Sequence, residues 1–196
     1  GLGNKFLSHI REVDAIVHLV RCFDSDKITH VNSKINPVED LETIKTEIIL
    51  SDIDVIQKKL DKGKKKLLSE TEVKILEEKL KQLNQGLELS ADNEANNKFL
   101  SNLGLLSVKP KIIVCNVDEE SLTKGNTFTE SVKNKHPNEK VVTICADIED
   151  QIMGLDNNER ETFMQDIGLN KTGLNQLIKE GYDLLNLDTF FTSGPE

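Results

Sequence analysis

The sequence has 196 residues, a formal net charge of −9 and a pI of about 5.1, which excludes a basic surface for nucleic acid over the whole molecule. It is 37% hydrophobic and 30% charged, the balance of a soluble, helix-rich protein, and no apolar run approaches the roughly 18 residues of a membrane span. No secretory signal opens the chain. We therefore expect a cytoplasmic protein with no membrane partner and no sequence-specific binding to DNA.

The cysteines and histidines do not form a metal-binding pattern. Cys22, Cys115 and Cys145 are odd in number, and each lies in an apolar, strand-like run. We predict that they are reduced thiols of the core. There is no Cys-x-x-Cys, and the four histidines are scattered, so the sequence predicts no metal ligands.

The first third of the chain predicts a helix, a strand and a second helix. Residues 5–12 read as a helix, and residues 15–23 form a continuous apolar run that is typical of a central parallel strand. A polar loop follows over residues 24–35. Asn36-Pro37-Val38-Glu39 then opens a long helix, with Asn as the N-cap, Pro at the first helical position and Glu at the third. Apolar residues three and four apart give this helix one apolar face, until Gly63 breaks it.

A capping box, Ser69-x-x-Glu72, marks the start of the next helix, whose apolar residues again recur every three or four positions until Gly86. Two such helices with a short turn predict an antiparallel, coiled-coil-like hairpin. A third helix is expected from Ser90, with an apolar face that presents Ala95, Phe99, Leu103 and Leu106.

The pattern then returns to strands and shorter helices. Strands are expected over residues 111–117 and 141–146, and helices near 127–135, within 149–167 and over 173–185. The order is therefore βα, a helical insertion of about 70 residues, and βαβα. The predicted fold is α/β: part of a doubly wound sheet, interrupted by a helical hairpin.

The most informative segment is the apolar strand that ends in Asn116-Val117-Asp118-Glu119. Open α/β sheets bind ligands at the carboxyl ends of their strands. In GTPases the strand at this place ends in Asn-Lys-x-Asp, which reads guanine. Here Val117 replaces the Lys and Glu119 the Asp, so the position suits a purine but the residues suit guanine poorly. The alternative is that Asn116 only caps the strand end.

Several motifs spread along the chain resemble the YchF/Obg-like ATPases. The motifs are residues 1–7 with 10–12, residues 14–23, Asn36-Pro37, Asn116-Val117-x-Glu119, residues 173–175 and residues 185–192. The resemblance covers essentially the whole chain and implies a P-loop NTPase fold. It assigns residues 1–38 and 109–187 to the nucleotide-binding domain, residues 39–108 to a coiled-coil insertion, and residues 188–196 to the start of a TGS domain.

The resemblance also implies which parts of the nucleotide site are absent. The motif Gly-x-x-x-x-Gly-Lys-Ser/Thr does not occur in the sequence, and in the family it would precede Gly1. The intact protein is therefore expected to be an ATPase that uses ATP and Mg²⁺, with the Mg²⁺ ligands outside this chain. We expect the chain itself to be a fragment that binds ATP poorly and does not hydrolyse it.

For the base, the resemblance implies that Asn116 reads the adenine edge, that Val117 packs on the base and that Glu119 no longer rewards guanine. Asp118 adds a second carboxylate, so either acid could face the base. Cys145 and Ala146 match a turn that offers backbone N–H groups to the base, with an ordinary strand-to-helix turn as the alternative.

Catalysis and partners are implied by two further features. His30 lies where the family is proposed to orient the attacking water, whereas a lone loop histidine is usually a solvated surface residue; His18 is better explained as a core histidine. The family associates with ribosomes, and a lysine cluster around Gly63 would attract rRNA phosphates unless it is only a solvated turn. The cluster comprises Lys58, Lys59, Lys62, Lys64, Lys65 and Lys66. The resemblance leaves two functions open: an ATP-hydrolysing switch, or a binding module that nucleotide merely biases.

Overall fold

The computed structural model describes residues 3–25, 34–63, 68–89 and 94–191. They form two compact units: the first comprises residues 1–16 and 39–109, and the second residues 17–38 and 110–196. The helical insertion predicted over residues 39–108 lies in the first unit. Residues 1–16 group with that unit, whereas the resemblance assigned them to the nucleotide-binding domain.

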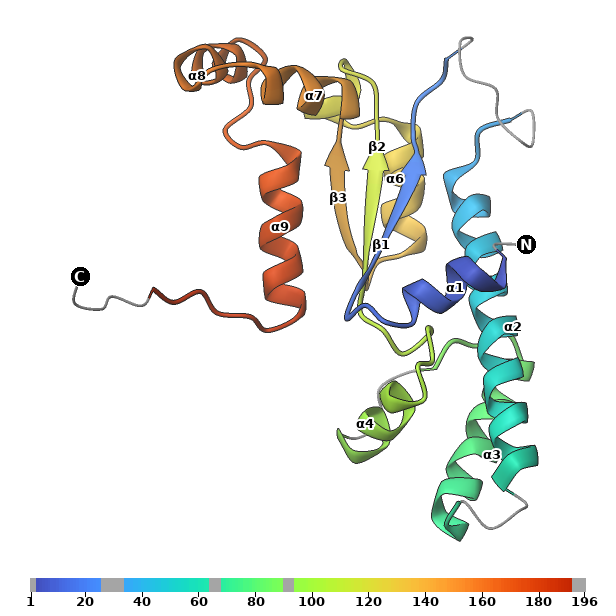
Figure 1. Ribbon diagram of the computed structural model, residues 1–196. Coiled ribbons are helices and arrows are strands. Elements are labelled where there is room, and N and C mark those ends of the chain that lie inside the picture. Colours follow the sequence, from blue (N-terminus) through green and yellow to red (C-terminus); the bar gives the residue numbers. More distant parts are fainter. Residues whose placement is uncertain (1–2, 26–33, 64–67, 90–93, 192–196) are drawn as a thin grey trace, which may run out of the picture. The chain divides into compact units, whose positions relative to one another are not determined.

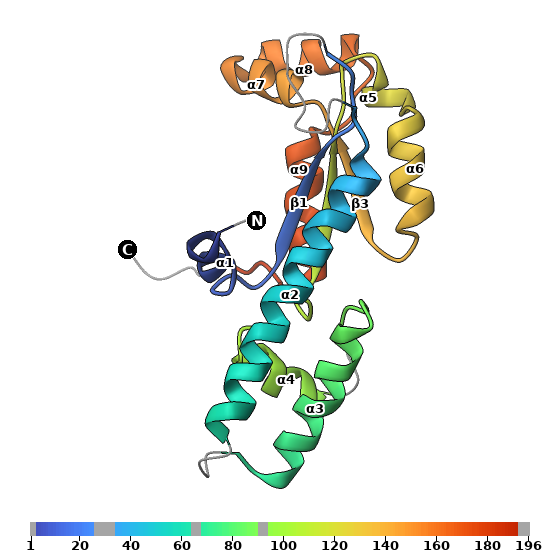
Figure 2. The same cartoon turned by 90° about the vertical axis from the view of Figure 1, so that its right-hand side faces the viewer.

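The first unit is helical. Helices α2 (Pro37–Gly63) and α3 (Glu70–Asn84) lie side by side and run in opposite directions (Figures 1 and 2). The predicted capping box is present: the Ser69 hydroxyl accepts from the Glu72 N–H at 3.2 Å, and the Glu72 carboxylate accepts from the Ser69 N–H at 2.7 Å. Ile56, Leu76 and other buried residues form an apolar core between the helices. The predicted helical hairpin is therefore confirmed.

Two shorter helices complete this unit, α1 (Asn4–Ile10) and α4 (Glu94–Asn102). The sequence predicted the start of α4 at residue 90, which lies outside the described residues. The predicted face of this helix extended to Leu106, but the helix ends at Asn102, and Gly104 follows with a φ of +70°. A left-handed φ favours glycine, so the chain leaves the helix there and the buried Leu105 and Leu106 belong to the segment beyond it.

A buried carboxylate joins three segments of the helical unit. Asp52 of α2 is wholly buried and accepts hydrogen bonds from the Leu106 N–H at 2.9 Å and the Ser107 N–H at 2.8 Å. Its second oxygen also accepts from the Ser107 hydroxyl at 2.6 Å. The Arg11 guanidinium lies 3.4 Å from the first oxygen. Asp52 therefore connects α2 both to the segment that follows α4 and to the residue that ends α1.

The second unit contains a sheet whose strands all point in one direction, in the order β1 (Ile16–Arg21), β2 (Lys111–Asn116), β3 (Lys140–Ile144) (Figure 1). Strands β2 and β3 pair in parallel, with Ile112 opposite Lys140 and Asn116 opposite Ile144. Helices α6 (Thr127–Lys135) and α9 (Gly173–Leu184) cover opposite faces (Figure 2). Helices α5 (Ser121–Lys124), α7 (Ala146–Gly154) and α8 (Asn157–Asp166) lie at the carboxyl ends of the strands (Figure 2).

Strand β2 is buried on both faces, as its continuous apolar run predicted, with Ile112 to Cys115 each 3% exposed or less. Strand β1 differs from the prediction. It is an edge strand of the described sheet, and Val17 and Leu19 are 50% and 60% exposed. An apolar run indicates that a strand can be buried, but the number of strands that pair with it depends on the tertiary structure.

No helix among the described residues combines the length and apolar character needed to cross a bilayer. No group of three or more His, Cys, Asp or Glu side chains lies close enough together in these segments to hold a metal ion.

Candidate functional site

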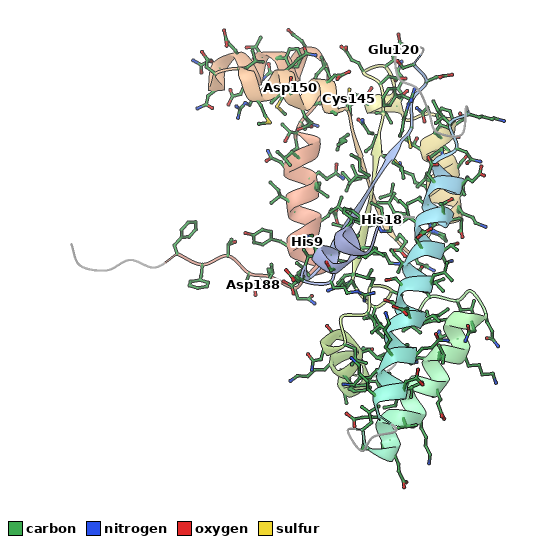
Figure 3. All side chains as sticks on the ribbon, turned by 45° about the vertical axis from the view of Figure 1, so that its right-hand side comes forward. His9, His18, Glu120, Cys145, Asp150 and Asp188 are labelled. Atoms are coloured by element: carbon green, nitrogen blue, oxygen red, sulfur yellow. The ribbon has the colours of Figure 1, made fainter. Side chains whose placement is uncertain are left out.

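A pocket of about 750 Å³ opens at the carboxyl ends of the three strands. The lining comes from the end of each strand or the segment that follows it: residues 23–25 after β1, Asn116 at the end of β2 with residues 117–119 after it, and residues 145–147 with Gln151 after β3. Figure 3 shows Cys145 at the end of β3 and Glu120 in the loop after β2. The pocket lies within the second unit, at the sheet edge that the sequence pattern indicated.

Asn116 connects the ends of all three strands. Its backbone carbonyl accepts from the Cys22 N–H at 2.7 Å, and its side-chain Oδ1 accepts from the Ala146 N–H at 3.0 Å. The second bond is the backbone cap that the alternative interpretation expected of Asn116. The same bond fixes the amide plane, so the Nδ2 group becomes the donor that faces away from Ala146. The Ala146 N–H, which the resemblance assigned to a base, is donated to Asn116 here.

The remaining residues of the Asn-x-x-Glu motif differ in how firmly they are held. Val117 is 2% exposed and donates its N–H to the Ile144 carbonyl at 2.8 Å. One carboxylate oxygen of Asp118 accepts from the Ser121 N–H at 2.9 Å, in the loop that leads into α5. Glu119 is exposed at the pocket wall. Of the two acids, Asp118 is thus tied to its own loop.

Cys145 is the N-cap residue of α7 and is almost fully buried. Burial raises the pKa of its thiol above the ordinary value, and the negative charges of Asp147 and Glu119 act in the same direction. The thiol is therefore neutral at physiological pH and contributes no negative charge to the pocket.

The other two cysteines, Cys22 and Cys115, lie beside each other. A hydrogen bond from the Cys22 thiol lowers the pKa of Cys115, and the positive charge of Lys133 adds to this effect against the opposing effect of burial. All three cysteines are buried and free, as the sequence predicted.

One residue of this pocket, Phe23, and the Arg21 side chain beside it were not singled out from the sequence. Phe23 lines the pocket, and the Arg21 guanidinium lies 4.9 Å from the centre of its ring. Arg21 also donates from Nε to the Phe23 carbonyl at 3.1 Å and from Nη2 to the Ser25 carbonyl at 3.2 Å. The available signal was an arginine at the end of a strand with an aromatic residue two positions later, a pattern too common to be noticed by itself.

Several predicted residues lie elsewhere. His30, Lys64, Lys65 and Lys66 are outside the described residues, so their roles stay predictions. Lys58, Lys59 and Lys62 lie at the end of α2 in the helical unit. Lys58 pairs with Asp54 at 2.5 Å, and the charge of Lys59 contributes, after the hydrogen bonds from Ser69, to lowering the pKa of Glu72. Two of these three lysines therefore have acidic neighbours on their own unit.

Comparisons with known proteins identify the relatives of this chain. It is 41% identical over 206 residues to the ribosome-binding ATPase YchF of Escherichia coli O157:H7, and 38% identical over 207 residues to that of Bacillus subtilis. Its structure matches that of the Schizosaccharomyces pombe YchF GTPase with a TM-score of 0.86, at 27% identity. The chain is homologous to the YchF family along its whole length. No protein-family model matches it.

The match to YchF covers 99% to 100% of this chain but only 56% to 57% of each of these relatives. The chain thus spans little more than half the length of the YchF proteins that it matches. The α/β fold predicted from the sequence is that of the solved YchF structure. The relatives carry different names, ATPase in the two bacteria and GTPase in the yeast, so the names alone do not decide which base this chain would bind.

Proposed function

We propose that this chain forms the base-recognition part of the nucleotide site in a ribosome-associated P-loop ATPase, which binds and hydrolyses ATP in preference to GTP. The observation that carries the proposal is the position of Asn116. Its side chain is held by Ala146 at the junction of three strand ends, in a pocket of about 750 Å³, in a chain homologous to YchF.

Asn116 would hold the purine without choosing between the two bases. Because Oδ1 is bonded to Ala146, the amide Nδ2 is the group that donates to a ligand. N7 of adenine and N7 of guanine both accept such a bond. Phe23 lines the same pocket and supplies apolar surface on which either base would pack, whereas the buried Val117 adds little surface of its own.

The choice of base would come from the acids. A carboxylate that accepts hydrogen bonds from N1–H and the 2-amino group strengthens the binding of guanine. It cannot do so for adenine, which lacks the 2-amino group and whose N1 is an acceptor. Asp118 has one oxygen bonded to Ser121, so it is not free to turn both oxygens to a base. Glu119 is the acid at the motif position, and its longer side chain would not reproduce the guanine contact. We therefore assign the loss of guanine preference to Glu119.

The phosphates and Mg²⁺ require groups that this sequence lacks. In P-loop proteins a backbone loop and its Lys hold the phosphates, and a Ser or Thr of the same motif binds Mg²⁺. No such motif occurs in these 196 residues. We propose that the chain alone has no turnover, and that His30 positions the attacking water in the protein that also contains a P-loop.

A titration of ATP and GTP tests the proposal, with this chain and with the chain extended N-terminally through the P-loop. We expect that only the extended chain binds tightly and that it prefers ATP. Asn116→Ala should weaken ATP binding about tenfold, the effect of losing one well-placed hydrogen bond in a pocket. Asn158→Ala, on the exposed surface of α8, is the matched control. A preference for GTP would refute the assignment of Glu119.

The lysines at the end of α2 support a second function. In this alternative the helical hairpin contacts rRNA or a protein partner, and nucleotide only biases the conformation. His30→Ala in the extended chain separates the two. Loss of hydrolysis with loss of the cellular effect supports the enzyme, whereas loss of hydrolysis with intact ribosome binding supports the binding module.

A further inference from the structure

We propose that Arg21 is a positioning residue, which holds the loop after β1 in place as one wall of the nucleotide pocket. This inference rests on the proposed function of the pocket. Arg21 is the last residue of β1, and its side chain is half-buried. It does not line the pocket itself, so its effect on a ligand would be exerted through the loop.

The evidence is a set of three contacts made by one guanidinium. Nε donates to the Phe23 carbonyl at 3.1 Å, Nη2 donates to the Ser25 carbonyl at 3.2 Å, and the charged group lies 4.9 Å from the centre of the Phe23 ring. Phe23, Asp24 and Ser25 are the residues that β1 contributes to the pocket. Of these three residues, Arg21 contacts Phe23 and Ser25 directly, and Asp24 lies between them in the chain.

The loop is anchored at its base by other residues. The Cys22 N–H donates to the Asn116 carbonyl at 2.7 Å, and the Cys22 carbonyl accepts from Asn126 Nδ2 at 2.7 Å. These bonds align Cys22 with the end of β2, but they do not hold Phe23 or the residues after it. Beyond Cys22, the Arg21 contacts continue the alignment, with a local bond from the Ser25 N–H to the Asp24 carboxylate at 2.9 Å.

An arginine suits this role better than a lysine. The planar guanidinium has five N–H donors in a fixed geometry, so it can bind two carbonyls two residues apart and still present a face to an aromatic ring. The ammonium group of lysine is a single point, which can bind one carbonyl or approach the ring but cannot fix all three. A loop held by lysine would sample more conformations and would pay an ordering cost when a ligand binds.

The experiment uses the whole chain with adenosine as the probe, because adenosine tests the base pocket without the phosphate groups. Titrations at millimolar concentrations are followed by NMR at the amides of Asn116 and Ala146. The variants are Arg21→Lys and Arg21→Met. Arg160→Lys is the control, since Arg160 lies outside the pocket and donates to the Leu155 carbonyl at 3.3 Å. Amide hydrogen exchange at Asp24 and Ser25 reports on the loop without any ligand.

We expect both Arg21 variants to bind adenosine about fivefold more weakly, as for the loss of about one net hydrogen bond. Exchange at Asp24 and Ser25 should become faster in them, while the Ala146 amide, bonded to Asn116, stays protected. Unchanged affinity in the Arg21 variants would overturn the inference and leave the proposed function intact. Equal weakening in Arg160→Lys would also overturn it. If the unsubstituted chain gives no shift at Asn116 or Ala146, the proposed function itself fails.

Discussion

At the scale of single residues, Asp52 and Asn116 each fix segments that are distant in the sequence. Asp52 accepts three hydrogen bonds from the segment after α4 and pairs with Arg11. Asn116 bonds to Cys22 and Ala146. A buried polar group with satisfied partners costs much more to remove than an exposed one, because its partners remain buried without it.

The pair Asp52 and Asp54 tests this difference within one helix. Asp52→Ala should lower the free energy of unfolding by about 3 kcal/mol, because the Arg11 charge and two backbone N–H groups lose their partner. Asp54→Ala removes only an exposed ion pair with Lys58 and should cost less than about 0.5 kcal/mol. Denaturant unfolding of the two variants gives the comparison. Similar costs for both would show that the Asp52 network does not stabilise the helical unit.

At the scale of elements, helix starts are set by local caps and helix positions by close packing. Helix α9 shows both, since Thr172 caps its third residue and Glu149 of α7 accepts from the Gly173 N–H at 2.6 Å. Gly173 also lies so close to β3 that a Cβ there would be 2.6 Å from Ile144 Cγ2. The close approach of α9 to the sheet therefore requires glycine at its first residue.

Two glycines of α9 provide a test of this close approach. Gly173→Ala should destabilise the chain by about 2 kcal/mol, because the new methyl group must displace Ile144 or Glu149. Gly181→Ala, where a Cβ meets no atom within 4 Å, should instead stabilise by up to about 1 kcal/mol through its better helix propensity. Thermal unfolding of both variants measures the signs. A neutral result for Gly173→Ala would mean that α9 can move away from the sheet without cost.

The capping box of α3 predicts a pH dependence. Hydrogen bonds from the Ser69 backbone and hydroxyl lower the pKa of Glu72 below its ordinary 4.5. Because the folded-state pKa is lowered, this stabilisation is complete above pH 4.5 and is lost as the pH falls through the folded-state pKa. Glu72→Gln should thus be less stable than the unsubstituted chain at pH 7, and the difference should shrink at pH 3. Glu77→Gln, in the middle of α3, should show a smaller dependence in the same unfolding series.

At the scale of the whole molecule, the net charge of −9 opposes binding to a polyanion, so any contact with rRNA must use a local positive group. The lysine cluster around Gly63 is the candidate. The positive charges of Lys58 and Lys59 are partly offset by the nearby carboxylates of Asp54 and Glu72, which weakens their attraction for a phosphate.

Co-sedimentation with purified ribosomes tests the cluster. If it contacts rRNA, changing its six lysines to glutamine should reduce binding, and the remaining binding should depend less steeply on salt by about 0.7 to 0.9 per lost phosphate contact. Changing Lys124, Lys133, Lys135, Lys140, Lys171 and Lys179 instead, all in the second unit, controls for net charge. Equal loss in both sets would show that only the total charge matters.

Much of the fold could be predicted because its signals are local. The capping box at Ser69, the start of α2 at Pro37, the buried run of β2 and the helix at residues 127–135 depend on residues within one or two turns of each other. The pocket position could be predicted for a related reason. Polar residues that directly follow a buried parallel strand must lie at the carboxyl edge of the sheet, which is where open α/β sheets bind ligands. The motif also located Asn116, and the resemblance led to the family that the comparisons then identified.

The sequence by itself therefore determined most of the elements, their order and the edge of the sheet that carries the pocket. Tertiary structure alone decided that β1 lies at the edge of the described sheet, that Asp52 is buried against Ser107, and that Arg21 binds the loop beside Phe23. The physical reason is distance along the chain and direction in space. A cap or an apolar period joins neighbouring residues, whereas burial, ion pairing and the aim of a guanidinium depend on groups that only the folded chain brings together.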